Sequence, residues 1–324
     1  MSGAAAATAD TPRTAIADVG PDDFVQWIKT SYGHAGAVPQ GEKAAAARLR
    51  YVFVNGFLNE AVPTHFNESL ATLRALGVPS SQLHHLFPPS VNSVEENARY
   101  LAGQLGEIAA RGEQKLVVIG HSKGAAESLA AALIAPKGLL ERIQAVFLLQ
   151  GAIRGTAFAD YFFGDGKEVD ERFPWPLRKA FRWAKNTSPD LILKRLESTI
   201  GITLGDGVRS LTRARMEALW KKLVSERGEQ ARELTGKVFY ITSWETQSRL
   251  SLPLQVPGLY LTTYYGDNDG LIGTDTQVWA GLGKVLGRLR ASHAATVDVK
   301  GSTHQHSLRR AMTEALARAA VNIR

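Results

Sequence analysis

The chain has 324 residues, a net charge of +7 at pH 7 and no cysteine. Its 44% hydrophobic and 21% charged residues are typical of a globular protein with a sizeable core. The lack of cysteine excludes disulfides and zinc sites with thiolate ligands. No run of 18 apolar residues occurs, so we expect no transmembrane helix.

Residues 1–45 predict a flexible tail and a short helix. The first 20 residues are rich in Ala, Thr and Asp and lack the basic start and long apolar stretch of a signal peptide. We therefore expect a soluble protein whose compartment, cytoplasmic or secreted, the sequence leaves open. Residues 22–31 follow with apolar side chains at helical spacing.

Residues 46–156 predict the first part of an α/β core. Ser93 followed by Glu96 forms a capping box at the start of a long helix. Because strands and helices alternate, we expect a mostly parallel sheet flanked by helices. The expected strands are residues 48–55, 83–87, 115–119 and 145–150, and the expected helices are residues 66–76, 90–111 and 125–135.

A G-x-S-x-G pattern, Gly120 to Gly124 with Ser122 at its centre, joins the strand at 115–119 to the helix that follows. A serine on such a turn is presented as a nucleophile at the carboxyl end of the strand, and the turn leaves almost no room for side chains two residues away. Glycine at both positions meets that need. The alternative is a plain turn with a passive serine.

Residues 157–235 break the alternation, with aromatic clusters and helical periods but no convincing buried strand. We interpret them as an inserted helical cap or lid. Residues 236–324 predict the second part of the core. Strands are expected at 237–243, 259–265 and 296–300, before a closing helix at 307–322.

A nucleophilic serine needs a base and an orienting carboxylate on later loops. Asp269, with Asp267 as the alternative, follows the strand expected at 259–265. His304, with His306 as the alternative, follows the strand expected at 296–300. The remaining histidines lack a carboxylate pattern and are interpreted as surface or packing residues: His34, His65, His84, His85, His121 and His293.

The motifs GHSKG and N-D-G-L-I, followed by a histidine on the last loop, resemble the serine hydrolases of the α/β-hydrolase fold. N-D-G-L-I is similar to the N-D-G-L-V of bacterial lipases. The resemblance covers residues 48–157 and 236–324. It implies Ser122 as nucleophile, Asp269 as acid and His304 as base.

The resemblance also implies an oxyanion hole formed by the backbone N–H groups of Phe57 and Lys123. Asn55-Gly56 stands where such lipases usually have His-Gly. This chemistry needs no cofactor or metal. The implied function is hydrolysis of carboxylic esters, chiefly of lipids or other apolar acyl groups. The alternatives are an acyltransferase or thioesterase with the same residues, or a catalytically silent relative that binds an anionic surface.

The positive charge gathers in the expected cap. Residues 172–222 contain twelve Lys or Arg and four acidic residues. These cations are interleaved with Trp175, Phe181, Trp183 and Trp220, a mixture typical of helices in a membrane interface. The alternative is a solvated cap whose aromatic residues pack on the core. No nucleic-acid-binding motif accompanies the charge, so we expect no nucleic acid partner. The oligomeric state stays open.

Overall fold

The computed structural model describes residues 20–186, 194, 197–198, 205–297 and 303–323. In this part, six strands form one sheet in which every neighbouring pair is parallel, in the order β2-β1-β3-β4-β5-β6. This confirms the predicted mostly parallel α/β fold. The strands are β1 (Arg50–Val54), β2 (Leu83–Leu86), β3 (Leu116–His121), β4 (Ile143–Leu149), β5 (Val238–Trp244) and β6 (Lys284–Arg290).

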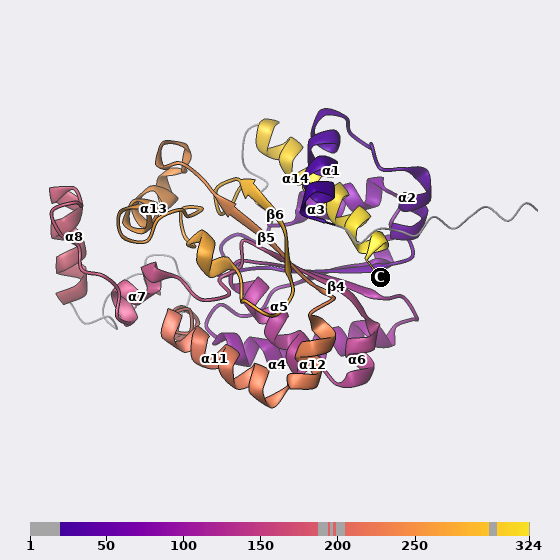
Figure 1. Cartoon of the computed structure of the whole chain (residues 1–324), viewed down its shortest axis with the longest axis horizontal. Helices are drawn as coiled ribbons and strands as arrows, with labels where there is room; N and C mark the ends of the chain where they lie inside the picture. Colours follow the sequence, from indigo (N-terminus) through magenta and orange to yellow (C-terminus); the bar gives the residue numbers. More distant parts are fainter. Residues whose placement is uncertain (1–19, 187–193, 195–196, 199–204, 298–302, 324) are drawn as a thin grey trace, which may run out of the picture.

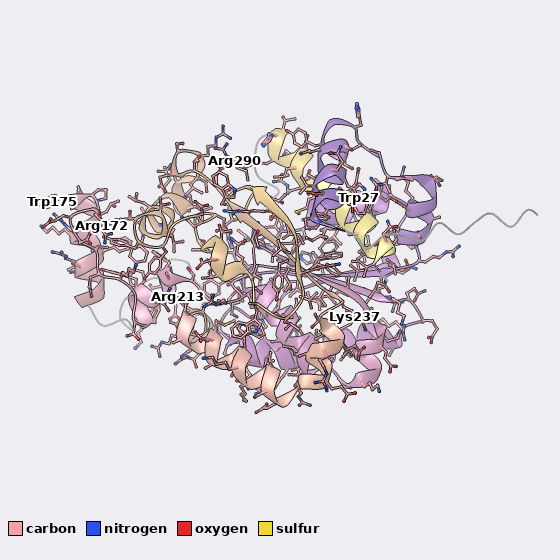
Figure 2. All side chains as sticks on the ribbon, in the orientation of Figure 1. Trp27, Arg172, Trp175, Arg213, Lys237 and Arg290 are labelled. Carbon is pink, nitrogen blue, oxygen red and sulfur yellow. The ribbon has the colours of Figure 1, made fainter. Side chains whose placement is uncertain are left out.

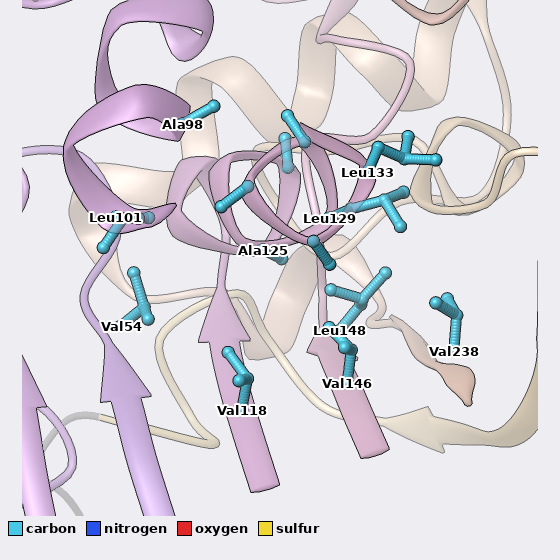
Figure 3. Close-up of a cluster of buried hydrophobic side chains, with 14 of the residues drawn as sticks. Val54, Ala98, Leu101, Val118, Ala125, Leu129, Leu133, Val146, Leu148 and Val238 are labelled. Atoms are coloured by element: carbon cyan, nitrogen blue, oxygen red, sulfur yellow. The ribbon is translucent and has the colours of Figure 1, made fainter. Parts of the chain in front are cut away.

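One face of the sheet is covered by α4 (Val94–Ala110), α5 (Lys123–Ile134), α6 (Lys137–Arg142), α11 (Arg213–Glu226) and α12 (Gly228–Leu234) (Figure 1). Alternate strand residues such as Val54, Val118 and Val146 point toward this layer. Figure 3 shows them below Ala125 and Leu129 of α5. Burial of this apolar surface is the main stabilising contribution that we assign to the layer.

The opposite face packs against α1 (Pro21–Gly33), α2 (Gln40–Ala46), α3 (Asn67–Ala75) and α14 (Thr303–Asn322) (Figure 1). Phe53, Phe147 and Phe239 are among the strand residues that point this way. Because residues on one strand alternate between two buried faces, the central strands read as continuous apolar runs in the sequence. This is why β1, β3, β4 and β5 are predicted correctly.

The capping box is also confirmed. Ser93 Oγ accepts a hydrogen bond from the Glu96 N–H at 3.2 Å, and Glu96 Oε2 accepts one from the Ser93 N–H at 2.8 Å. The helix that they start, α4, lies against α5. None of the helices in the described part of the chain is long and apolar enough to cross a bilayer.

Two sequence predictions for the last third of the chain fail. Residues 259–265 are not a strand, because Leu252–Tyr264 forms helix α13. The strand expected at 296–300 is absent at 296–297, and residues 298–300 lie outside the described residues. The sixth strand is instead β6, an edge strand whose burial alternates along part of its length.

The segment expected to form a cap contains two kinds of helix. Met216, Trp220 and Leu223 of α11 belong to the same buried cluster as the sheet, and the Trp220 indole N–H donates to the carbonyl of Ile153. A separate aromatic cluster joins α7 (Ala157–Phe163) and α8 (Trp175–Asn186) to α13, and α8 projects from the body of the molecule (Figure 1).

The remaining described helices are short. They are α10 (Gly205–Arg209) and the 3₁₀ turns η1 (Ser80–Gln82), η2 (Gln247–Arg249) and η3 (Thr274–Gln277). Gly207 of α10 lies so close to the segment after β2 that a Cβ there would stand 1.8 Å from the Ser90 carbonyl oxygen. The Gly207 N–H also donates a hydrogen bond to the Val91 carbonyl at 3.0 Å, so α10 packs directly against the backbone of residues 90–92.

Candidate active site

Ser122 stands on a strained turn between β3 and α5. Its backbone angles are φ 56° and ψ −126°, a region that L-residues rarely adopt. A Cβ on Gly120 would lie 2.6 Å from the Gly124 carbonyl oxygen, and one on Gly124 would lie 2.2 Å from the Asn55 carbonyl oxygen. Both contacts are too short, which confirms that the turn excludes side chains at these positions.

Replacement of Gly124 by alanine is expected to destabilise the fold by about 3 kcal/mol, since the new methyl group would meet rigid backbone. Gly103, in the middle of α4, is the matched control because a Cβ there meets nothing within 4 Å. Gly103→Ala should stabilise the protein by about 0.5–1 kcal/mol. Urea unfolding measures both changes, and equal effects of the two substitutions would contradict the close packing at Gly124.

His293 lies between Ser122 and Asp269. Its Nε2 is 2.8 Å from Ser122 Oγ, and its Nδ1 is 2.9 Å from Asp269 Oδ2. All three side chains are buried. Ser122 follows β3 directly and His293 follows β6 by three residues, so both lie at the carboxyl ends of strands. Asp269 lies on the segment between α13 and η3. The geometry is that of a nucleophile, a base and an orienting acid.

The structure places His293, and neither of the two histidines expected from the sequence, beside Ser122. His304 lies in the first turn of α14, is exposed, and its Nδ1 hydrogen bonds with the Tyr32 hydroxyl. His306 is also exposed and pairs with Glu68 at 3.1 Å. Neither histidine contacts Ser122 or Asp269, because both belong to a helix rather than to a loop that reaches the sheet edge. The histidine that contacts both Ser122 and Asp269 is His293, which the sequence interpretation counts among the surface or packing residues.

Both oxygens of Asp269 are engaged. Oδ1 accepts hydrogen bonds from the backbone N–H groups of Leu271 and Ile272 at 3.0 and 2.9 Å. Oδ2 faces His293, and Gln277 Nε2 lies 3.4 Å from it. The alternative acid, Asp267, is exposed and pairs with Arg288 at 2.8 Å. Only Asp269 of the two is placed to orient an imidazole.

The loop that holds His293 is tied down by Gln150. Gln150 Nε2 donates to the Ser292 carbonyl at 3.0 Å and to Ser243 Oγ at 2.5 Å, and its Oε1 accepts from the Thr296 hydroxyl. Gln150 is fully buried and has φ 48°. No sequence motif marks Gln150 as part of the site.

The loop after β1 lies beside the nucleophile. A Cβ on Gly56 would stand 2.8 Å from Ser122 Cβ, so only glycine lets this loop approach. Phe57 follows directly. Lys123 is the first residue of α5, where backbone N–H groups have no partner within the helix. The two N–H groups expected to form an oxyanion hole thus come from adjoining segments.

The ring of His121 packs against the ring of His293, with 4.7 Å between the ring centres. Its Nε2 lies 2.8 Å from the His293 carbonyl oxygen, and burial lowers the pKa of His121 well below its ordinary value. A neutral ring there adds no positive charge beside His293. Among the described residues, no group of three His, Asp or Glu side chains is arranged to hold a metal ion.

A parallel sheet with helices on both faces and a strained serine turn after β3 defines an α/β-hydrolase fold. Neither a family model nor a curated protein matches the chain. Among solved structures, the chain is similar to the metagenomic carboxyl esterase MGS0156. Their TM-score is 0.60 at 23% identity, and the match covers 85% of this chain and 76% of the esterase.

The mature form of the lipase BlEst2 from Bacillus licheniformis is a second similar structure. Its TM-score is 0.51 at 18% identity, covering 76% of this chain and 85% of the lipase. At these identities the similarity establishes the fold. The sequence-based resemblance to the α/β-hydrolase fold is therefore confirmed.

Proposed function

We propose that the protein is a serine hydrolase that cleaves carboxylic esters through an acyl-enzyme. The observation that carries this proposal is the unbroken sequence of contacts from Asp269 through His293 to Ser122, with 2.9 and 2.8 Å between the joined atoms. The names of the two similar structures, a carboxyl esterase and a lipase, support the same reaction class.

In the first half of the proposed reaction, His293 Nε2 takes the proton of Ser122 Oγ as that oxygen attacks the ester carbonyl carbon. The carbonyl oxygen becomes an oxyanion, which accepts hydrogen bonds from the N–H groups of Phe57 and Lys123. Asp269 stabilises the imidazolium. The C–O bond to the alcohol then breaks, and His293 returns the proton to the departing oxygen.

In the second half, His293 takes a proton from water, and the hydroxide oxygen attacks the acyl carbon. The bond to Ser122 Oγ breaks and the proton returns to that oxygen, which releases the carboxylic acid. A thioester would react through the same steps with a thiol as the leaving group. Acyl transfer would differ only in the acceptor, an alcohol or amine in place of water.

We extend the proposal to esters of apolar acyl groups. The loops after the strands carry aromatic and aliphatic helices at the edge of the sheet where Ser122 lies. There α7 and α13 pack together through Tyr161, Tyr260 and Leu261. An apolar acyl chain leaving water would find apolar partners on such elements.

A fluorophosphonate probe tests the proposal, because it reacts only with an activated serine. We expect the wild-type protein to be labelled at Ser122 and the Ser122→Ala variant to remain unlabelled. The p-nitrophenyl esters of increasing chain length then rank the acyl preference, and thioesters and alcohol acceptors separate the alternatives. A wild-type protein that is neither labelled nor active on any ester would refute the proposal.

A second candidate role, binding of an anionic membrane surface, is favoured by α8. Trp175 and Trp183 are 66% and 60% exposed, and Lys179 Nζ lies 5.8 Å from the Trp175 ring centre. Figure 2 shows Trp175 at the end of the projecting helix. Two aromatic residues expected at the interface, Phe181 and Trp220, are instead buried in the protein. The proposed surface is therefore limited to α8.

The combined variant Arg178→Glu/Lys179→Glu is expected to weaken binding to phosphatidylglycerol vesicles at low salt by at least tenfold, since each cation near such a surface contributes about 1 kcal/mol. Lys221→Glu/Lys222→Glu is the matched control: it makes the same change in net charge on exposed residues of α11. Vesicle co-sedimentation measures both. Equal losses would show that net charge alone governs binding, and no binding by the wild type would exclude this role.

A further inference from the structure

The side chain of Lys123 is buried directly behind the nucleophile. Only 1% of it is exposed, and its Nζ lies 2.6 Å from Glu127 Oε1, whose side chain is 2% exposed. The same ammonium donates a hydrogen bond to the carbonyl of Asn92 at 2.8 Å. A charged pair therefore lies inside the protein in the first two turns of the helix that follows Ser122.

Stability does not account for this pair. Removing two charges from water costs several kcal/mol per ion, and apolar residues of similar size are often equally stabilising or better. A cation in the first turn of α5 also opposes the helix dipole. Burial raises the pKa of Glu127, and the Lys123 ammonium opposes that rise. Packing alone therefore does not explain why Lys123 and Glu127 are buried together.

Both members of the pair hold the segment at residues 88–92. Lys123 binds the Asn92 carbonyl, as described above. Glu127 Oε1 accepts a hydrogen bond from Asn97 Nδ2 at 2.7 Å, and the same amide group donates to the Pro89 carbonyl at 2.9 Å. The pair thus fixes this segment at two points, one near each end.

The segment at 88–92 in turn holds the loop after β1. Ser90 Oγ accepts a hydrogen bond from the Leu58 N–H at 2.9 Å. Glu60 accepts hydrogen bonds from the Ser90 N–H and hydroxyl at 2.8 and 2.5 Å. Leu58 has φ 62°, so this loop is held in a conformation that it would not favour alone. Phe57, the proposed oxyanion donor, immediately precedes Leu58.

We propose that Lys123 and Glu127 are positioning residues that align the two halves of the oxyanion hole. One half is the Lys123 N–H itself. The other is the Phe57 N–H, which is held through Asn92, Asn97 and Ser90. The inference rests on the proposed esterase function. It adds that the buried pair fixes the distance between the Phe57 and Lys123 N–H groups.

The test is the double variant Lys123→Met/Glu127→Leu, which keeps both backbone N–H groups and replaces the charges with apolar chains of similar length. We expect a wild-type Tm, a kcat lowered about tenfold to hundredfold and a KM changed less than twofold. Loss of one oxyanion donor costs about a hundredfold to a thousandfold, and displacement of a donor costs less. The inhibition constant of a trifluoromethyl ketone, whose adduct carries the oxyanion, should rise by the same factor.

The chain offers a matched control in Glu233 and Lys237, which are also four residues apart. Lys237 Nζ lies 2.9 Å from Glu233 Oε1 and donates to the Leu140 carbonyl at 3.0 Å, remote from α8 and α13 in Figure 2. Lys237→Met/Glu233→Leu should leave kcat unchanged. A folded Lys123→Met/Glu127→Leu protein with wild-type kcat would overturn the inference.

Ser90→Ala removes the side-chain hydrogen bonds of Ser90 with Leu58 and Glu60 without altering the charged pair. It should lower kcat with little change in KM, and combined with the double variant it should cost less than the product of the two effects. A wild-type kcat for Ser90→Ala, or fully multiplicative effects, would overturn the inference. If the double variant does not fold, the kcat of Ser90→Ala decides. An inactive, unlabelled wild type would instead remove the proposed function, and this inference with it.

Discussion

Replacement of His293 by alanine is expected to lower kcat for ester hydrolysis by about four to six orders of magnitude. The reason is chemical: Nε2 of His293 lies 2.8 Å from Ser122 Oγ and is the proposed acceptor of its proton. Without that base the serine hydroxyl is a weak nucleophile at neutral pH. Steady-state kinetics on a p-nitrophenyl ester measures the loss, with circular dichroism to show that the variant is folded.

His304→Ala is the matched control, since it removes the histidine that the sequence pattern favours. The exposed His304 contacts Tyr32 and lies in α14, so kcat should stay within about twofold of wild type. The same holds for His306→Ala. A severe loss in His304→Ala combined with an active His293→Ala protein would return the role of base to His304.

The first half of the chain is predictable because its signals are local. β3 and β4 are short apolar runs with both faces buried, and α4 begins with a capping box. The turn at Ser122 is marked by two glycines: Gly120 leaves room for Gly124 and Ala125 of the same turn, and Gly124 leaves room for the Asn55 carbonyl after β1. Apart from the contact of Gly124 with Asn55, each of these signals lies within a single strand, turn or helix start.

His293, the proposed base, is missed because the strand before it is missed. β6 lies at the edge of the sheet, and Lys284, Arg288 and Arg290 interrupt its apolar residues. Edge strands carry charged residues that reduce pairing with other chains, so their sequence is less apolar than that of a central strand. His293 stands three residues after β6, a position that would identify it once the strand is recognised.

The prediction of a strand at residues 259–265 fails for a different reason. Its β-branched and aromatic residues favour a strand locally. In the fold, Tyr260, Leu261 and Tyr264 lie on one face of α13 and pack against Tyr161, Phe173 and Phe181 from α7, α8 and the segment between them. A short apolar run is ambiguous between helix and strand, and here contacts with a distant part of the chain decide.

In the expected cap, the sequence likewise does not predict which aromatic side chains are buried. Its charge pattern marks residues 172–222 as one basic unit, yet Trp220 lies in the core beside the sheet, whereas Trp175 and Trp183 are exposed on α8. Composition does not separate these roles, because Trp residues flanked by Lys and Arg occur on both helices. The burial of each side chain is set by what its helix packs against.

Replacement of Asp269 by asparagine is expected to lower kcat by about 10⁴ with little change in KM. The backbone N–H groups of Leu271 and Ile272 bind Oδ1 and would keep an amide oxygen in that place. The amide NH₂ would then face His293 Nδ1, which must accept rather than donate. That tautomer carries its proton on Nε2, toward Ser122, and is unable to take the serine proton.

Asp267→Asn separates this effect from a general loss of negative charge in the loop. Asp267 is 65% exposed and its partner Arg288 is 50% exposed, and such surface pairs contribute less than about 1 kcal/mol. We therefore expect kcat within twofold of wild type. Both variants remove one negative charge from the same loop, but Asp269 is buried against His293 whereas Asp267 is exposed and pairs with Arg288. Equal losses in the two variants would mean that Asp269 acts on the active site through charge alone rather than by fixing the tautomer of the base.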